Sequence, residues 1–350
     1  MTNKSECAIL IPKKEIKKEN RNEAILMRKR ILSRACAAVL IVGVMFVGGC
    51  KNADTENTAL QTEETDTKAQ AETAGETQYP LTITDDLGNE VVIEEEPKRV
   101  ISLSPANTET LFALGADDQI VGRTDYCNYP EEASEVPSVG SYSSPNTELI
   151  ISMDADVIFA SDYMDDSIRS QVENAGAKVI IFAANDMESV ESDILTAGQV
   201  LNRNDKAKEI TDNMEKEMTD LREILSANTE EKSAFIDLGD YYSAGEGSLL
   251  GNMLEDIGVR NIAADTGEAW PQLSVETIIE ADPDVYISLY TSPEELKQAP
   301  GLSSLDCIQN DQIIYYDGLS PEADLIQRAG PRLAEGTRLL AEQIYPELFS

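Results

Sequence analysis

Residues 148–160 read ELIISMDADVIFA, and residues 276–288 read ETIIEADPDVYIS. Six of the thirteen positions are identical without a gap: one glutamate, two isoleucines, two aspartates and one valine. Each copy predicts a helix, a tight Asp-x-Asp turn and a buried strand. The copies begin 128 residues apart, which is too far for the short period of a solenoid. The repeat therefore predicts two similar lobes, with these segments at equivalent positions.

Short apolar strands alternate with helical stretches on both sides of the two copies. Residues 104–108 are expected to end the first strand and cap the helix that follows, and Gly115 is expected to end that helix. This alternation predicts parallel α/β sheets. We expect strands at residues 100–103, 157–160, 179–182, 234–237, 285–288 and 313–316.

A long amphipathic helix is predicted between the two lobes. Apolar residues recur at spacings of 4, 4, 3 and 4 and form one stripe. We therefore predict two Rossmann-like α/β lobes, at residues 81–203 and 229–350, joined by a single interlobe helix at residues 204–228. A helical connection permits only modest hinge motion. The stripe consists of Ile210, Met214, Met218, Leu221 and Leu225.

The first part of the chain has the pattern of an export signal. Four arginines and lysines precede a run of thirteen apolar residues that ends in Val47-Gly48-Gly49-Cys50. The run is shorter than the roughly 20 residues of a membrane span. Small residues before a cysteine resemble a bacterial lipobox, in which Cys50 is lipidated; an ordinary signal with an incidental cysteine is the alternative. Residues 1–49 are thus an upstream extension plus signal peptide, with translation expected to start at Met27.

Residues 50–80 are expected to form a disordered acidic tether. They are rich in Thr, Glu, Ala and Gln and have too few large apolar side chains to offset the entropy of ordering. Without residues 1–50, which carry 10 basic and 4 acidic residues, the net charge changes from −37 to −43. The mature body keeps only two cysteines, and a large core needs no disulfide.

Composition excludes several classes of function. The chain has 65 acidic and 28 basic residues and no histidine. Such a chain lacks the basic surface that nucleic-acid binding requires. Without histidine there is no Ser-His-Asp or Cys-His pair and no His-ligated metal. We therefore expect no nucleic-acid partner, no catalytic residues, no metal site and no resident cofactor.

Three motifs give the chain a specific resemblance. Residues 85–115 read DDLGNEVVIEEEPKRVISLSPANTETLFALG, residues 140–150 read GSYSSPNTELI, and residues 327–336 read QRAGPRLAEG. With the signal, the tether and the two lobes, they resemble class III substrate-binding lipoproteins of ABC importers, which handle cobalamin, ferric siderophores and haem. The resemblance covers residues 81–350 and is closest to the cobalamin-binding member. It implies a monomer on the outer face of the cell membrane, held there by its lipid, that delivers a ligand to a permease dimer with ATPase subunits.

The resemblance also implies a ligand site on loops that follow strands. Four aromatic residues and an acid–arginine pair match segments that line the cleft of the cobalamin-binding member. An aromatic residue in a loop is more often a packing residue, and an i,i+4 pair is often a plain surface ion pair. The chain departs from that member where Ser161 stands in place of a tryptophan. The implied ligand residues are Tyr126, Tyr142, Tyr242, Trp270, Asp324 and Arg328.

Glu148 and Glu276 open the two repeated helices, behind the expected caps Asn146 and Ser274. An acid in the first turn is stabilised by the helix dipole whatever else it does. In the family, one such glutamate on each lobe docks onto arginines of the transporter. An Arg–carboxylate pair fixes orientation because it is bidentate. Both roles are compatible.

The ligand is expected to be cobalamin or a related corrinoid, because such a near-neutral, amide-fringed molecule suits an acidic, aromatic-lined cleft. A ferric siderophore ranks second and Tyr-ligated haem third. An extracytoplasmic enzyme is a much weaker alternative. Its only support is Gly245, Gly247 and Gly251, which form GxGxxxG rather than a dinucleotide-binding GxGxxG. Flexible loop glycines explain that pattern better.

Overall fold

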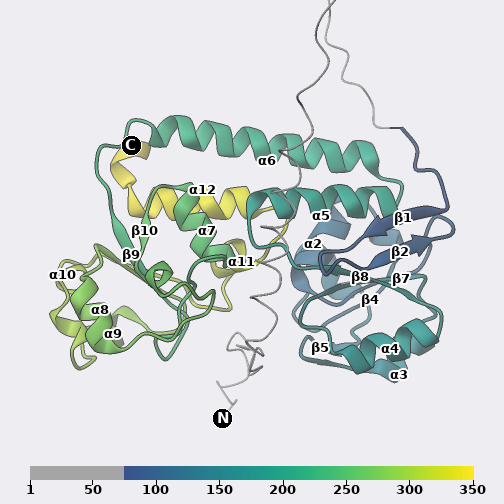
Figure 1. Ribbon diagram of the computed structural model, residues 1–350, viewed down its shortest axis with the longest axis horizontal. Helices are drawn as coiled ribbons and strands as arrows, with labels where there is room; N and C mark the ends of the chain where they lie inside the picture. The colour runs from purple at the N-terminus through teal and green to yellow at the C-terminus, as the bar shows by residue number, and fades with distance from the viewer. Residues whose placement is uncertain (1–74) are drawn as a thin grey trace, which may run out of the picture. The chain divides into compact units, whose positions relative to one another are not determined.

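The structure is a computed structural model, and it describes residues 75–350 (Figure 1). The signal peptide with Met27, the lipidation site Cys50 and most of the predicted tether lie outside the described residues. Two four-stranded parallel sheets confirm the α/β class. Each sheet runs 2-1-3-4 in its own chain order. The strands are, in spatial order, β4 (Ile120–Arg123), β3 (Val100–Ser102), β7 (Val157–Ser161) and β8 (Lys178–Phe182), then β10 (Arg260–Asn261), β9 (Ser233–Asp237), β11 (Val285–Ser288) and β12 (Ile313–Tyr315).

The first sheet belongs to the N-terminal lobe, which runs from β1 to α5. An antiparallel hairpin precedes its parallel strands, and a second two-stranded ribbon follows β4. Neither was predicted from the sequence. The remaining elements of this lobe are β1 (Leu81–Thr84), β2 (Glu90–Ile93), α2 (Pro105–Ala113), η1 (Asp117–Gln119), η2 (Glu131–Glu135), β5 (Gly140–Ser141), β6 (Ser144–Pro145), α3 (Thr147–Ser152), α4 (Asp166–Asn174) and α5 (Met187–Val200).

The second sheet belongs to the C-terminal lobe, which runs from β9 to η5. Helices alternate with its strands, as the parallel pairing requires. Between the lobes in sequence lies α6 (Asn204–Leu225), close to the predicted residues 204–228. The remaining elements are α7 (Leu249–Asp256), η3 (Ile262–Thr266), α8 (Val275–Ala281), α9 (Pro293–Leu296), η4 (Leu302–Ser304), α10 (Asp306–Gln309), α11 (Pro321–Gln327), α12 (Leu333–Ile344) and η5 (Pro346–Phe349).

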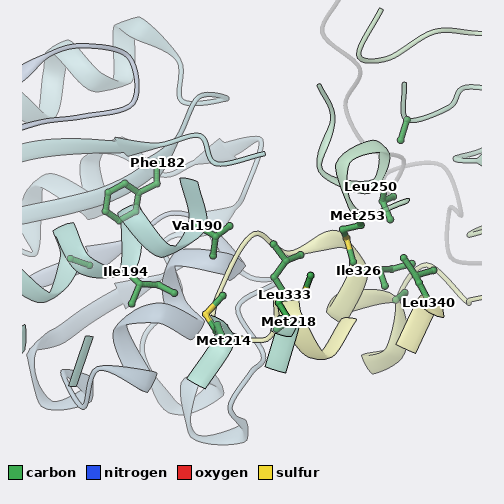
Figure 2. Close-up of a cluster of buried hydrophobic side chains, with 14 of the residues drawn as sticks. Phe182, Val190, Ile194, Met214, Met218, Leu250, Met253, Ile326, Leu333 and Leu340 are labelled. Carbon is green, nitrogen blue, oxygen red and sulfur yellow. The ribbon is translucent and has the colours of Figure 1, made fainter. Parts of the chain in front are cut away.

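Helix α6 shares one hydrophobic core with elements of both lobes (Figure 2). It packs against α5 of the N-terminal lobe and α12 of the C-terminal lobe. Met214, Met218 and Leu221 of the predicted stripe are buried, and Ile210 and Leu225 are partly buried against the same core. Each large apolar side chain buried in this way contributes about 1.5–3 kcal/mol. The long helix α6, rather than a flexible linker, therefore joins the two lobes.

The repeated segments form equivalent structures in the two lobes. Helix α3 leads through Asp154 into β7, and α8 leads through Asp282 into β11; both aspartates have positive φ, of 49° and 41°. The last aspartate of each turn then accepts a hydrogen bond from the backbone at the start of the neighbouring strand. Asp156 Oδ2 accepts from Arg99 N (2.9 Å) just before β3, and Asp284 Oδ2 accepts from the N–H of Ser233 (2.7 Å) at the start of β9. The identical residues of the two copies thus form the same helix–turn–strand segment and the same hydrogen bond to the adjacent strand.

The folded body begins earlier than predicted. The sequence assigned residues up to 80 to the tether, but Thr77 N donates to Asn202 Oδ1 (2.9 Å) and Tyr79 Oη donates to the carbonyl of Val200 (3.0 Å). These bonds tie residues 77–79 to the end of α5. Among residues 75–350, no helix has both the length and the apolar character needed to span a membrane.

Candidate functional site

The predicted ligand residues of the N-terminal lobe lie on two loops. Tyr126 follows β4 and is 43% exposed. Tyr142 lies between β5 and β6, where its hydroxyl is 2.8 Å from Ser161 Oγ and its ring is 6.0 Å from that of Tyr163. Burial raises the pKa of Tyr142, so its hydroxyl stays protonated at neutral pH. A protonated phenol beside an exposed aromatic ring suits a ligand with amide groups and a flat face.

A small pocket of about 20 Å³ lies beside Tyr142 and Ser161. Tyr163 also lines this pocket. Its free space is on the scale of a water molecule.

The predicted ligand residues of the C-terminal lobe lie on two loops that are bonded together. The segments of Tyr242 and Trp270 are joined by bonds from Ser243 N to the carbonyl of Pro271 (2.8 Å) and from Gly245 N to that of Ala269 (2.9 Å). Both aromatic side chains are partly buried against the core. They are thus fixed in place by packing while part of each remains exposed.

The sequence suggested that Gly245, Gly247 and Gly251 are flexible loop glycines, but two of the three are required by close packing of the backbone. A Cβ on Gly245 would lie 2.1 Å from the carbonyl oxygen of Glu268, and one on Gly251 would lie 2.2 Å from that of Gly245. Both positions require glycine because backbone approaches backbone closely. This steric requirement accounts for two of the three glycines that imitate a dinucleotide loop.

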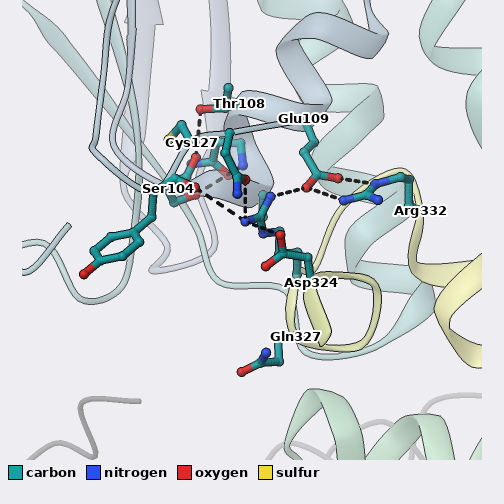
Figure 3. Close-up of polar contacts among 12 residues, drawn as sticks. Ser104, Thr108, Glu109, Cys127, Asp324, Gln327 and Arg332 are labelled. Atoms are coloured by element: carbon teal, nitrogen blue, oxygen red, sulfur yellow. Dashed lines mark hydrogen bonds and ion pairs between the residues drawn. The ribbon is translucent and has the colours of Figure 1, made fainter. Parts of the chain in front are cut away.

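Asp324 and Arg328 belong to a buried ion network that reaches the other lobe (Figure 3). Asp324 Oδ2 is 2.7 Å from Arg328 Nη2, and these side chains are only 17% and 10% exposed. Arg328 Nη1 also donates to Glu109 Oε1 of α2 (2.7 Å). Burial raises the pKa of Asp324, whereas the adjacent Arg328 opposes that shift. The pair is therefore not a plain surface ion pair.

Glu109 and Arg332, which were not predicted from the sequence, also belong to this network. Glu109 is 2% exposed in its side chain and also accepts from Arg332 Nε (2.8 Å) and Nη2 (2.7 Å). The sequence did carry a hint of their importance, because both residues lie inside the quoted motifs at residues 85–115 and 327–336. Nothing in their spacing, 223 positions apart, pairs one with the other.

The two repeated glutamates, Glu148 and Glu276, are exposed in the first turns of α3 and α8. The expected caps are confirmed: Asn146 Oδ1 accepts from Leu149 N (3.0 Å), and Ser274 Oγ accepts from Thr277 N (3.1 Å). Since the caps satisfy the helix ends, the carboxylates remain available to a partner.

The remaining chemistry of the described residues fits binding. Within residues 75–350, no three side chains of His, Cys, Asp or Glu come together as ligands of a metal ion. Cys127 and Cys307 are both buried and unpaired. The site therefore offers aromatic faces, hydroxyls and one buried ion network.

Two sheets of equal topology and a connecting helix define an α/β protein of two lobes. The chain belongs to the periplasmic binding protein family, whose model matches residues 100–318. It is similar to an uncharacterized ABC transporter substrate-binding lipoprotein of Bacillus subtilis, YvrC, with 32% identity over 89% of this chain and 97% of the relative. It is also similar to a cobalamin-binding protein of Halobacterium salinarum, with 26% identity over 76% of this chain and 74% of the relative.

Among solved structures, the chain resembles a possible iron-binding, periplasmic solute-binding protein of Staphylococcus epidermidis. The TM-score is 0.64 at 26% identity, over 72% of this chain and all of that one. The family and these relatives are solute-binding proteins rather than enzymes. The protein is therefore a substrate-binding component of an ABC transporter and acts outside the cytoplasm.

Proposed function

We propose that the protein captures cobalamin or a related corrinoid and delivers it to an ABC permease dimer with its ATPase subunits. The observation that carries this proposal is the placement of aromatic side chains on loops of both lobes: Tyr126 and Tyr142 on one, and Tyr242 and Trp270 on the other. Open α/β sheets bind ligands outside the carboxyl ends of their strands. Asp324 and Arg328 add polar groups to the same site.

A flat, near-neutral molecule with amide edges suits these groups better than an anionic one. The site offers aromatic faces for the ring system and hydroxyl groups for the amides. An anionic siderophore would meet a strongly acidic protein, which disfavours its approach. The relative named as a cobalamin-binding protein supports the same choice. A ferric siderophore or Tyr-ligated haem is the second candidate, favoured by the exposed Tyr126 and by the relative named as possibly iron-binding.

Fluorescence titration tests the ligand. Trp270 is the only tryptophan of the chain, so quenching reports directly on the C-terminal lobe. Cyanocobalamin is expected to quench Trp270 saturably, while haemin and a ferric siderophore are not. Calorimetry on Trp270→Phe provides an independent signal and is expected to show weaker binding. A saturable response to haemin or to the siderophore, with none to cyanocobalamin, would replace the corrinoid by the second candidate.

We further propose that lipid on Cys50 anchors the protein and that Glu148 and Glu276 dock it onto the permease. Beside each glutamate, one helical turn on, lies an exposed isoleucine: Ile151 is 40% exposed and Ile279 is 37% exposed. Positions three apart share a helix face. Each lobe therefore presents the same acidic and aliphatic pair, which suits a partner made of two related subunits.

Charge reversal tests the docking surface. Glu148→Arg combined with Glu276→Arg is expected to abolish uptake and leave ligand affinity unchanged. The matched control reverses two exposed glutamates elsewhere, Glu94 and Glu223, and is expected to transport normally. Uptake that survives the first double variant would remove the docking role.

A further inference from the structure

One buried carboxylate joins the two lobes. Glu109 of α2 lies between two arginines that come from the far end of the chain, and Figure 3 shows it facing Arg332. Its Oε1 is 2.7 Å from Arg328 Nη1 and 2.7 Å from Arg332 Nη2. Two bonds from Arg332 make that contact bidentate, which fixes orientation as well as distance. A carboxylate that is only 2% exposed requires such partners to balance its charge.

The same arginines hold the aromatic loop of the N-terminal lobe. Arg328 Nη2 donates to Asn128 Oδ1 (2.8 Å) and to the carbonyl of Tyr126 (3.4 Å). The guanidinium of Arg332 lies 3.6 Å from the centre of the Tyr129 ring, within the range of a cation–π contact. Residues 126–129 are thus held from the opposite lobe at three points.

We propose that Glu109 is a positioning residue of the binding cleft: it holds Arg328 and Arg332 in the geometry that fixes residues 126–129. The inference rests on the proposed function, because Tyr126 is one of the ligand residues. Glu109 itself is too deeply buried to touch a ligand in this arrangement. Its removal acts through the two arginines, which lose their common acceptor and release the loop.

Thiol labelling tests the inference without any ligand. Cys127 lies in the held loop, between the two residues that Arg328 contacts, and is 1% exposed. Cys307 of α10 is 2% exposed in the C-terminal lobe and serves as the internal control. In the full chain, Glu109→Gln is expected to speed the reaction of Cys127 with N-ethylmaleimide by about tenfold or more, because local opening controls access to buried groups. The rate at Cys307, followed by peptide mass spectrometry, is expected to stay the same.

Two results would overturn the inference. One is an unchanged rate at Cys127; the other is an equal acceleration at both thiols, which means general destabilisation. Glu342→Gln is the matched control, because it breaks the more exposed Arg338–Glu342 pair (2.8 Å). That variant is expected to leave both labelling rates as they are.

Ligand binding supplies the second measurement. Glu109→Gln is expected to weaken cyanocobalamin binding by about tenfold, mainly through faster dissociation. The reason is that binding must then order a mobile loop, which costs conformational entropy. Glu109→Asp, which keeps the charge, is expected to recover part of the loss. Wild-type affinity in Glu109→Gln would overturn the positioning role. If the wild-type chain binds no corrinoid, the proposed function fails, and the labelling ratio still decides the role of Glu109.

Discussion

Asp193 is predicted to make the protein less stable as pH rises. It lies on α5, is 7% exposed, and faces Asp86 of the turn between β1 and β2. Burial, with the adjacent Asp86 charge, raises the pKa of Asp193 to about 9. The raised pKa means that the folded state binds a proton that the unfolded chain releases above about pH 4. The stability that this proton provides is complete at low pH and is lost as pH rises through about 9.

The expected magnitude follows from one bound proton. Between the unfolded and folded pKa values, each pH unit removes about 1.4 kcal/mol of unfolding free energy. From about pH 6 to about pH 8 the loss is about 2.7 kcal/mol, a large share of the about 5–15 kcal/mol that stabilises a typical domain. Asn cannot ionise, so Asp193→Asn removes this slope. Its stability relative to wild type is expected to rise by about 2.7 kcal/mol over the same interval.

Urea unfolding of both proteins at the two pH values measures this difference. Comparing variant with wild type cancels the contributions of other titrating groups. Asp118→Asn, at an exposed position of η1, is the matched control and is expected to follow the wild-type pH dependence. If Asp193→Asn and wild type lose stability in parallel between the two pH values, the carboxyl does not titrate as its burial implies, and the reasoning fails.

Three further outcomes follow from the same structure. Ile151→Ser with Ile279→Ser is expected to reduce stimulation of the transporter ATPase by about tenfold, because each loses apolar contact area, while cyanocobalamin affinity stays unchanged. Asp156→Ala and Asp284→Ala are each expected to cost about 0.5–1.5 kcal/mol in urea unfolding, because each removes a carboxylate that accepts from the backbone of a neighbouring segment. Equal stability to wild type would contradict this. Glu109→Ala is expected to cost about 3–5 kcal/mol, because it removes the buried carboxylate that Arg328 and Arg332 share and leaves Arg328 only its pair with Asp324. A loss below about 1 kcal/mol would mean that these contacts contribute no more than surface ion pairs do.

The regular parts of the fold were predictable because they depend on local pattern. The strand at residues 157–160 appears as β7, and the apolar stripe with Met214 and Met218 is buried on α6. The β1–β2 hairpin was missed, because its strands are half exposed and lack the continuous apolar run by which buried strands such as β11 were located. Residues 77–79 were assigned to the tether, since composition does not register the few hydrogen bonds that hold them.

The candidate site was predictable only in part, for a different reason. Tyr142 and Trp270 could be placed on loops after strands, which is a matter of local order. The role of Glu109 depends on Arg328 and Arg332, more than 200 residues further along the chain. Within the sequence of α2, Glu109 has the appearance of an ordinary helix-surface acid. Glu109 is buried only where the two lobes meet, so its burial cannot be predicted from the local sequence pattern.

The internal repeat separates the features that a partner meets twice from those that a ligand meets once. Both lobes keep the strand order 2-1-3-4 and the fastening aspartates Asp156 and Asp284. Both also present a glutamate and an isoleucine on the helix before the third strand. The loops after the strands do not repeat. In the N-terminal lobe, Tyr126 is exposed and its carbonyl accepts from Arg328 of the other lobe, whereas in the C-terminal lobe Trp270 packs against the hydrophobic core. Under the proposed function, the repeated surface suits a transporter of two related subunits, and the unlike loops suit an asymmetric ligand. That division predicts that sequence changes in the loops alter ligand specificity without disturbing docking.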